Sequence, residues 1–120
     1  MLKILSSAVA IGILNACASF PDAAMAPRAS VYKYVGSVQC KAGGTPLSAM
    51  MRQLSDAGIP VLDVSCGTDG RMHITMCGAA DGRIGIFEIA EAKLSAAAAL
   101  GFGPLDSLPE ASKTVCPKTP

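Results

Sequence analysis

The chain has 120 residues, a formal net charge of +1, 16% charged residues and 51% hydrophobic residues. This length corresponds to one domain at most. The composition excludes an intrinsically disordered chain, which would combine low hydrophobicity with high charge. The near-neutral charge excludes the basic surface that nucleic-acid binding requires, so nucleic acid is not expected among the partners.

The N-terminal residues have the pattern of an export signal. Lys3 makes a short basic start, and residues 4–14 form an apolar run broken only by small polar residues. The run is shorter than the ~20 residues of a membrane-spanning helix, and it fits the core of a signal peptide better than an uncleaved anchor. The segment 16–18 has the small-x-small form that ordinary signal peptidase cleaves.

A second cleavage pattern overlaps the first. The sequence Leu14-Asn15-Ala16-Cys17 resembles the lipobox of bacterial prolipoproteins, although Asn15 departs from the small or aliphatic residue usual at its position. The resemblance implies that residues 1–16 are a signal peptide, that Cys17 is lipidated, and that the lipid attaches the chain to a membrane. Ala18, where many inner-membrane lipoproteins have Asp, implies the outer membrane. Ordinary cleavage after Ala18 would instead give a soluble periplasmic or secreted protein.

The number of cysteines favours export by either route. Five cysteines cannot all pair within one chain, and an odd thiol is a liability in an oxidising compartment. Lipidation of Cys17, or its removal with the signal peptide, leaves four cysteines for two disulfides: Cys40, Cys66, Cys77 and Cys116. These four lack the close C-x-x-C pairs of a structural zinc site, so neither a metal nor a cofactor is expected.

The remaining chain divides into a tether, one domain and a tail. Residues 17–30 are rich in Ala and Pro and predict a flexible tether, residues 31–116 the domain, and residues 117–120 the tail. Alternating apolar residues predict a strand over 31–40. Thr45-Pro46 predicts the start of a helix that ends at Gly58, and residues 60–66 predict a second strand.

A short internal repeat follows the second strand. Cys66-Gly-Thr-Asp69-Gly-Arg71 is repeated in outline by Cys77-Gly-Ala-Ala-Asp81-Gly-Arg83. Asp-Gly pairs between apolar runs are strong hairpin signals, and they predict an antiparallel meander of strands 60–66, 72–77 and 83–89. A second helix is predicted over 90–100, and an irregular region follows from residue 105. The expected fold class is α+β, in the order β-α-β-β-β-α, with two helices on one face of a small, mostly antiparallel sheet.

This meander predicts the disulfide pairing. If residues 72–77 form the middle strand, Cys66 and Cys77 lie at opposite ends of the sheet, roughly 17–20 Å apart. A disulfide needs Cα atoms within about 7 Å. The predicted helix returns the chain between the first two strands and leaves Cys40 and Cys66 at the same end of the sheet, so the expected pairs are Cys40–Cys66 and Cys77–Cys116.

The functional hypotheses start from the only histidine, His73. Its neighbours Met72 and Met76 invite a copper-binding interpretation, but alternation along a strand would place the methionines and His73 on opposite faces. The leading hypothesis is a non-enzymatic exported envelope protein that binds a protein or another envelope component. One alternative is a periplasmic enzyme inhibitor or immunity protein, and another is a small hydrolase that uses His73. The expected partner contacts are the residues of the two Asp-Gly-Arg turns: Asp69, Arg71, Asp81 and Arg83.

Overall fold

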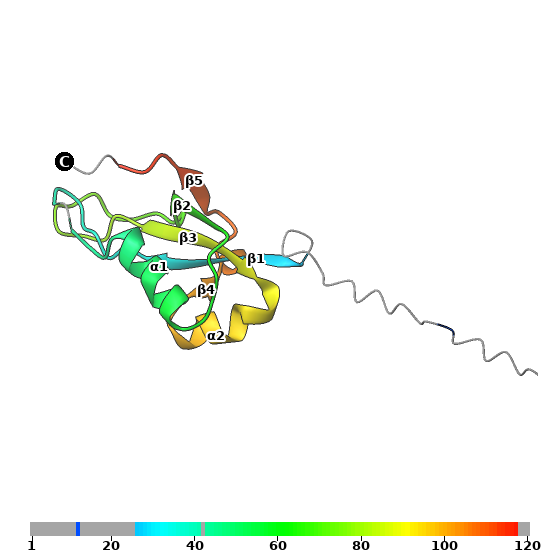
Figure 1. Cartoon of the computed structure of the whole chain (residues 1–120). Helices are drawn as coiled ribbons and strands as arrows, with labels where there is room; N and C mark the ends of the chain where they lie inside the picture. Colours follow the sequence, from blue (N-terminus) through cyan, green and yellow to red (C-terminus); the bar gives the residue numbers. More distant parts are fainter. Residues whose placement is uncertain (1–11, 13–25, 42, 118–120) are drawn as a thin grey trace, which may run out of the picture.

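The structure of the chain is a computed structural model that describes residues 12, 26–41 and 43–117 (Figure 1). The lipobox-like residues 14–17 lie outside the described residues. The elements in chain order are β1 (Arg28–Tyr34), α1 (Leu47–Asp56), β2 (Asp63–Thr68), β3 (Arg83–Ala90), the 3-10 helix η1 (Glu91–Lys93), α2 (Leu94–Ala99), β4 (Gly103–Pro104), the 3-10 helix η2 (Leu105–Ser107) and β5 (Ser112–Thr114). The predicted α+β class, the antiparallel sheet and the presence of two disulfides are confirmed.

The sheet has five antiparallel strands in the order β4-β1-β3-β2-β5. β3 lies at its centre, as its apolar residues on both faces require: Ile84, Ile86, Phe87 and Ile89 are all buried. Phe87 and Ile89 belong to the core on the helix side, whereas Ile84 and Ile86 pack with Leu108 in a smaller second cluster. The alternation of side chains along β3 therefore builds two cores from one strand.

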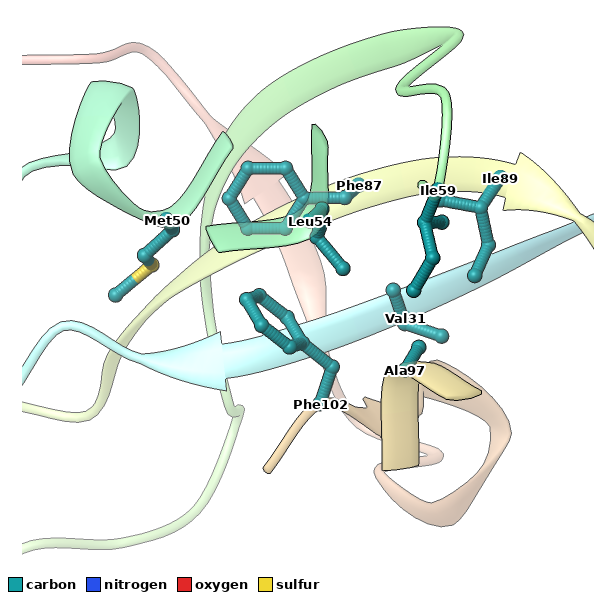
Figure 2. Packing of buried hydrophobic residues seen from close by; sticks show 8 residues of the cluster. All are labelled: Val31, Met50, Leu54, Ile59, Phe87, Ile89, Ala97 and Phe102. Carbon is teal, nitrogen blue, oxygen red and sulfur yellow. The ribbon is translucent and has the colours of Figure 1, made fainter. Parts of the chain in front are cut away.

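The two helices cover one face of the sheet (Figure 1). Met50 and Leu54 lie one turn apart on α1 and are both fully buried, which is the spacing of an amphipathic helix. The rings of Phe87 and Phe102 meet edge to face with centroids 5.6 Å apart. Figure 2 shows the helix-side core, which consists of Val31, Met50, Leu54, Ile59, Phe87, Ile89, Ala97 and Phe102.

Several predicted boundaries change. β1 begins at Arg28, so the last residues of the predicted tether are already part of the sheet. Thr45 does not cap α1, whose first helical residue follows Pro46 directly. The predicted helix over 90–100 divides into η1 and the shorter α2.

The predicted middle strand over 72–77 is wrong. Residues 71–76 form neither strand nor helix, because β2 and β3 pair directly and Thr68 is already opposite Arg83. The other edge of β2 is occupied by β5, which comes from the region predicted to be irregular. The residues between β2 and β3 therefore form a long loop at one end of the sheet instead of crossing it.

The predicted disulfide pairing is wrong for the same reason. The bonds are Cys40–Cys77 and Cys66–Cys116, each with its Cα atoms 5.1 Å apart. Because residues 72–77 do not run back along the sheet, Cys77 stays at the end where β1 leads into Cys40. Cys66 lies within β2 opposite Thr114 of β5, so the chain beyond β5 brings Cys116 to it.

Candidate functional site

The two Asp-Gly-Arg turns and His73, which the sequence singles out, lie at one end of the sheet. Tyr34 at the end of β1 is opposite Ile84 at the start of β3, and Thr68 at the end of β2 is opposite Arg83. At the other end, where the chain enters the domain, Arg28 is opposite Ala90. We call residues 69–82, which connect β2 to β3, the distal loop because they lie at the end opposite Arg28 (Figure 1).

Two equivalent turns form the ends of the distal loop. Asp69 Oδ1 accepts a hydrogen bond from the backbone N–H of Arg71, and Asp81 Oδ1 accepts one from that of Arg83, both at 3.0 Å. These are Asx turns, in which the aspartate side chain holds the backbone two residues on. The turns are adjacent, since the N–H of Asp69 donates to the carbonyl of Gly82 at 2.9 Å. The two similar sequence segments therefore form the same kind of turn.

Hydroxyl groups at the end of β1 and just after it donate hydrogen bonds to the second oxygen of each aspartate. Tyr34 donates to Asp69 Oδ2 at 3.0 Å, and Ser37 donates to Asp81 Oδ2 at 2.6 Å. The carboxylates point into the fold, and Asp69 is only 2% exposed. The two aspartates are therefore anchors of the loop, and of the four predicted contact residues only Arg71 and Arg83 present exposed side chains.

His73 joins the anchor at Asp69. Its Nε2 atom lies 3.0 Å from both carboxylate oxygens. Gly82 makes room for this contact, because a Cβ atom there would lie 2.6 Å from Asp69 Oδ1 and from His73 Nε2. The copper interpretation fails on this arrangement too, since His73 points inward to Asp69 while Met72 is fully exposed.

The electrostatics of the cluster follow from these contacts. Burial alone raises the pKa of Asp69, but the hydrogen bonds from His73, Arg71 and Tyr34 outweigh it, and its pKa lies below the ordinary value. Burial and the hydrogen bond to Asp69 raise the pKa of the Tyr34 hydroxyl. Asp69 is therefore held as a carboxylate that accepts every bond made to it.

The middle of the distal loop is held by Gln39 and by a disulfide. The Gln39 amide donates to the carbonyl of Ile74 at 2.7 Å and accepts from the N–H of Met76 at 3.1 Å. Next to it, Cys40 is bonded to Cys77. Sequence analysis missed Tyr34, Ser37 and Gln39, because their partners lie 35–44 residues away along the chain and no local pattern marks such contacts.

Held in this way, the loop presents three large apolar side chains to solvent. Met72 is 101% exposed, Ile74 68% and Met76 58%. Arg71, which precedes Met72 in the chain, is exposed as well. The predicted contact turns are thus the frame of a surface whose centre is apolar.

Other kinds of site find less support. In the described part of the chain no group of three or more His, Cys, Asp or Glu side chains could hold a metal ion. Two shallow hollows lie outside the distal loop, and the larger one, of about 430 Å³, is at the opposite end of the sheet, lined by Ala26, Pro27, Ala90, Glu91 and Ala92. Neither contains a cluster of polar groups that could orient a substrate.

No protein family, curated protein or solved structure matches this chain. Within the described ranges, no helix is long and apolar enough to cross a membrane. The two disulfides indicate that the folded chain resides in an oxidising environment. Within the described residues, the distal loop is the candidate functional site.

Proposed function

We propose that this chain is an exported bacterial envelope protein that binds a protein partner through the distal loop. The observation that carries the proposal is the exposure of Met72, Ile74 and Met76 on a segment fastened by Cys77. Contiguous exposed apolar side chains mark interaction sites on soluble domains. Methionine is well suited to such a surface because its flexible thioether adapts to different partners.

The anchoring of the loop supports binding over passive exposure. A loop that is already ordered loses less conformational entropy when a partner docks, so more of the contact energy appears as affinity. Here the order comes from the Gln39 bonds, the Cys40–Cys77 disulfide and the pairing of His73 with Asp69.

The position of the loop agrees with a lipid anchor at Cys17. Residues 17–27 would span up to about 38 Å when fully extended, which would hold the domain clear of a membrane surface. Because the chain enters at Arg28, the distal loop lies at the end of the sheet away from that anchor. We propose that the loop faces the periplasm, and that its partner is a protein there and not the lipid surface to which Cys17 is attached.

A photo-crosslinking amino acid at position 72, in the full chain expressed in its native host, tests this proposal. We expect a covalent adduct with a protein when Met72 is replaced, and none when Met51 is replaced, since Met51 is an exposed methionine on α1 outside the loop. The additional changes Ile74→Ser and Met76→Ser should remove the adduct. The proposal fails if position 72 gives no adduct, or if positions 51 and 72 give the same one.

The inhibitor or immunity hypothesis uses the same surface. A disulfide-held loop with a protruding apolar centre is suited to entering the cleft of an enzyme. If the adduct at position 72 contains an enzyme, the purified chain should lower the activity of that enzyme. The variant with Ile74→Ser and Met76→Ser should not.

One contact favours a second function class, the His73-dependent hydrolase. His73 and Asp69 are paired, as a catalytic base and its orienting carboxylate are in a Ser-His-Asp triad. The hydroxyl that is hydrogen-bonded to this pair belongs to Tyr34, however, and it donates to Asp69. A panel of ester, amide and glycoside substrates decides the matter: activity that disappears in His73→Ala would establish the hydrolase, and activity unchanged by that substitution would eliminate it.

A further inference from the structure

Within the distal loop, the backbone of residues 73–76 has one bonded edge and one open edge. In an extended segment, the N–H and C=O groups of alternate residues point to the same edge. The Gln39 amide bonds the carbonyl of Ile74 and the N–H of Met76. A residue of a neighbouring parallel strand bonds the same two groups, so Gln39 occupies one edge of residues 74–76 in the manner of a strand.

The other edge belongs to His73 and Thr75. Among the residues that the structure describes, no hydrogen-bond partner meets the backbone N–H or C=O of either residue, and both residues are exposed. Natural proteins protect open strand edges with Lys, Pro or a covering element. Residues 72–76 contain neither Lys nor Pro, so the edge is free to accept a strand.

The sequence of this edge is complementary to itself. When two copies are placed antiparallel with Ile74 opposite Ile74, Met72 of each copy lies opposite Met76 of the other, and His73 lies opposite Thr75. All three pairs on the outer face are then apolar, and Arg71 lies opposite Cys77, so no like charges meet. The open groups of His73 and Thr75 fall at the hydrogen-bonded positions of this register, and Ile74 falls at the non-hydrogen-bonded position on the two-fold axis.

We infer that the partner of the distal loop is a second copy of this chain, added across a two-fold axis at Ile74 as an antiparallel strand pair. This inference rests on the proposed function, since it names the partner of the same loop. It converts the exposed Met72, Ile74 and Met76 into cross-strand pairs and satisfies the open backbone groups. An interface limited to one strand pair falls in the weak class, below about 1,200 Å² of buried surface, so the dimer exchanges with the monomer.

Cysteine substitutions in the full exported chain test the register. In a non-hydrogen-bonded pair the Cα atoms lie about 4.5 Å apart, within disulfide range, so Ile74→Cys should give a disulfide-linked dimer on a non-reducing gel. Met76→Cys is the matched control, since it lies on the same face but about 14 Å from its own copy in this register. We expect at least about ten-fold less linked dimer for Met76→Cys alone. Chains with Met72→Cys and chains with Met76→Cys, expressed together, should link to each other.

A backbone substitution tests the hydrogen bonds. Thr75→Pro removes an N–H that has no partner in the monomer, and by symmetry it removes two hydrogen bonds from the dimer. In the Ile74→Cys chain it should reduce linked dimer by about ten-fold or more, whereas Thr75→Val, which keeps the N–H, should leave it near the parent level. Mass mapping of the intact Cys40–Cys77 bond confirms folding of each variant.

The outcomes separate this inference from the proposed function. Absence of linked dimer in Ile74→Cys, or equal linking in Met76→Cys, overturns the strand pair. If position 72 then crosslinks to a different envelope protein, the inference fails and the proposed function stands. If position 72 captures nothing, both fail. An adduct of twice the chain mass together with dimer from Ile74→Cys supports both.

Discussion

Asp69 collects three hydrogen bonds on one buried carboxylate, from the backbone of Arg71, from Tyr34 and from His73. An amide in its place offers one oxygen and one NH2 group, and it turns a donor toward groups that already donate. We expect Asp69→Asn to lower the free energy of unfolding by about 2–3 kcal/mol at neutral pH. Urea unfolding measures this change. Asp56→Asn, at an exposed position, should change stability by less than about 0.5 kcal/mol.

The same carboxylate makes stability depend on acid pH. Because the pKa of Asp69 is lower in the folded chain than in the unfolded one, the folded state binds fewer protons, and stability falls as the pH drops. This contribution is complete above the unfolded value of about 3.9 and is lost as the pH falls through the folded pKa. Urea midpoints measured from pH 6 to pH 2 should fall less steeply in Asp69→Asn than in the parent, and parallel curves would contradict this assignment.

Two glycines of the distal loop separate backbone strain from side-chain crowding. Gly78 and Gly82 both have a positive φ, at 90° and 74°. A Cβ at position 78 meets nothing within 4 Å, whereas one at position 82 meets Asp69 and His73. We expect Gly78→Ala to cost about 1–2 kcal/mol of stability, and Gly82→Ala to cost about 1–3 kcal/mol more. Equal costs by thermal or urea unfolding would show that residue 82 does not pack against the Asp69 cluster.

At the scale of elements, Gln39 takes the place of a missing strand beside the distal loop. The N–H of Met76 is bonded to the Gln39 side chain, so Gln39→Ala should increase hydrogen–deuterium exchange at that amide by about ten-fold or more. Gln53→Ala on α1 provides the control, because Gln53 contacts Lys33 and not the loop. Unchanged exchange at Met76 in Gln39→Ala would mean that something else holds the loop.

The elements that can be predicted from the sequence are those whose pattern of apolar residues is visible within the element itself. The alternation in β1 and β3 and the spacing of Met50 and Leu54 predict their elements because each pattern reflects one buried face. Residues 72–77 alternate just as clearly but form no strand. β2 pairs directly with β3 on one edge and with β5 on the other, and β5 comes from more than forty residues further along the chain. The wrong strand also made the disulfide prediction wrong, because it placed Cys77 at the end of the sheet away from Cys40, whereas the two cysteines are bonded.

In the candidate site, too, the contacts between residues close in sequence are predictable and those between distant residues are not. Asp69, Asp81 and the turns that they hold are local in sequence, and the repeated Asp-Gly-Arg pattern predicts them. The side chains that bond the distal loop to the rest of the fold, those of Tyr34, Ser37 and Gln39, are 35–44 residues away from their partners along the chain. No local sequence pattern marks such contacts, so the sequence does not predict that Met72, Ile74 and Met76 are exposed.

For the whole molecule, the two disulfides carry a large part of the stability. They close segments with sequence separations of 37 and 50 residues, and the chain-entropy description gives about 4 kcal/mol for each. A small domain has a total stability of about 5–15 kcal/mol. Reduction should therefore unfold the domain or leave it marginal at 37 °C, as near-UV and far-UV circular dichroism would show. A reduced chain with an unchanged melting temperature would contradict this account.

The intact mass of the exported chain tests both the proposed lipidation of Cys17 and the two disulfides. We expect a lipid-modified chain that begins at Cys17 and reacts with four equivalents of alkylating agent only after reduction. Digestion without reductant should release peptides joined as Cys40–Cys77 and Cys66–Cys116. A lipid-free chain that begins near Ser19 would make the protein diffusible, and peptides joined in any other way would contradict the two disulfides.

The Cys40–Cys77 bond also determines how the domain would carry mechanical load. A partner that pulls on the distal loop, against an anchor attached before Arg28, applies tension along the sheet from one end to the other. That tension passes from Cys77 through the disulfide to Cys40 and then along β1 to Arg28, so the route is covalent throughout. The hydrogen bonds of the sheet are not on this route and need not break. The domain would therefore act as a short inextensible link, and only reduction of that one bond would transfer the force to the strands.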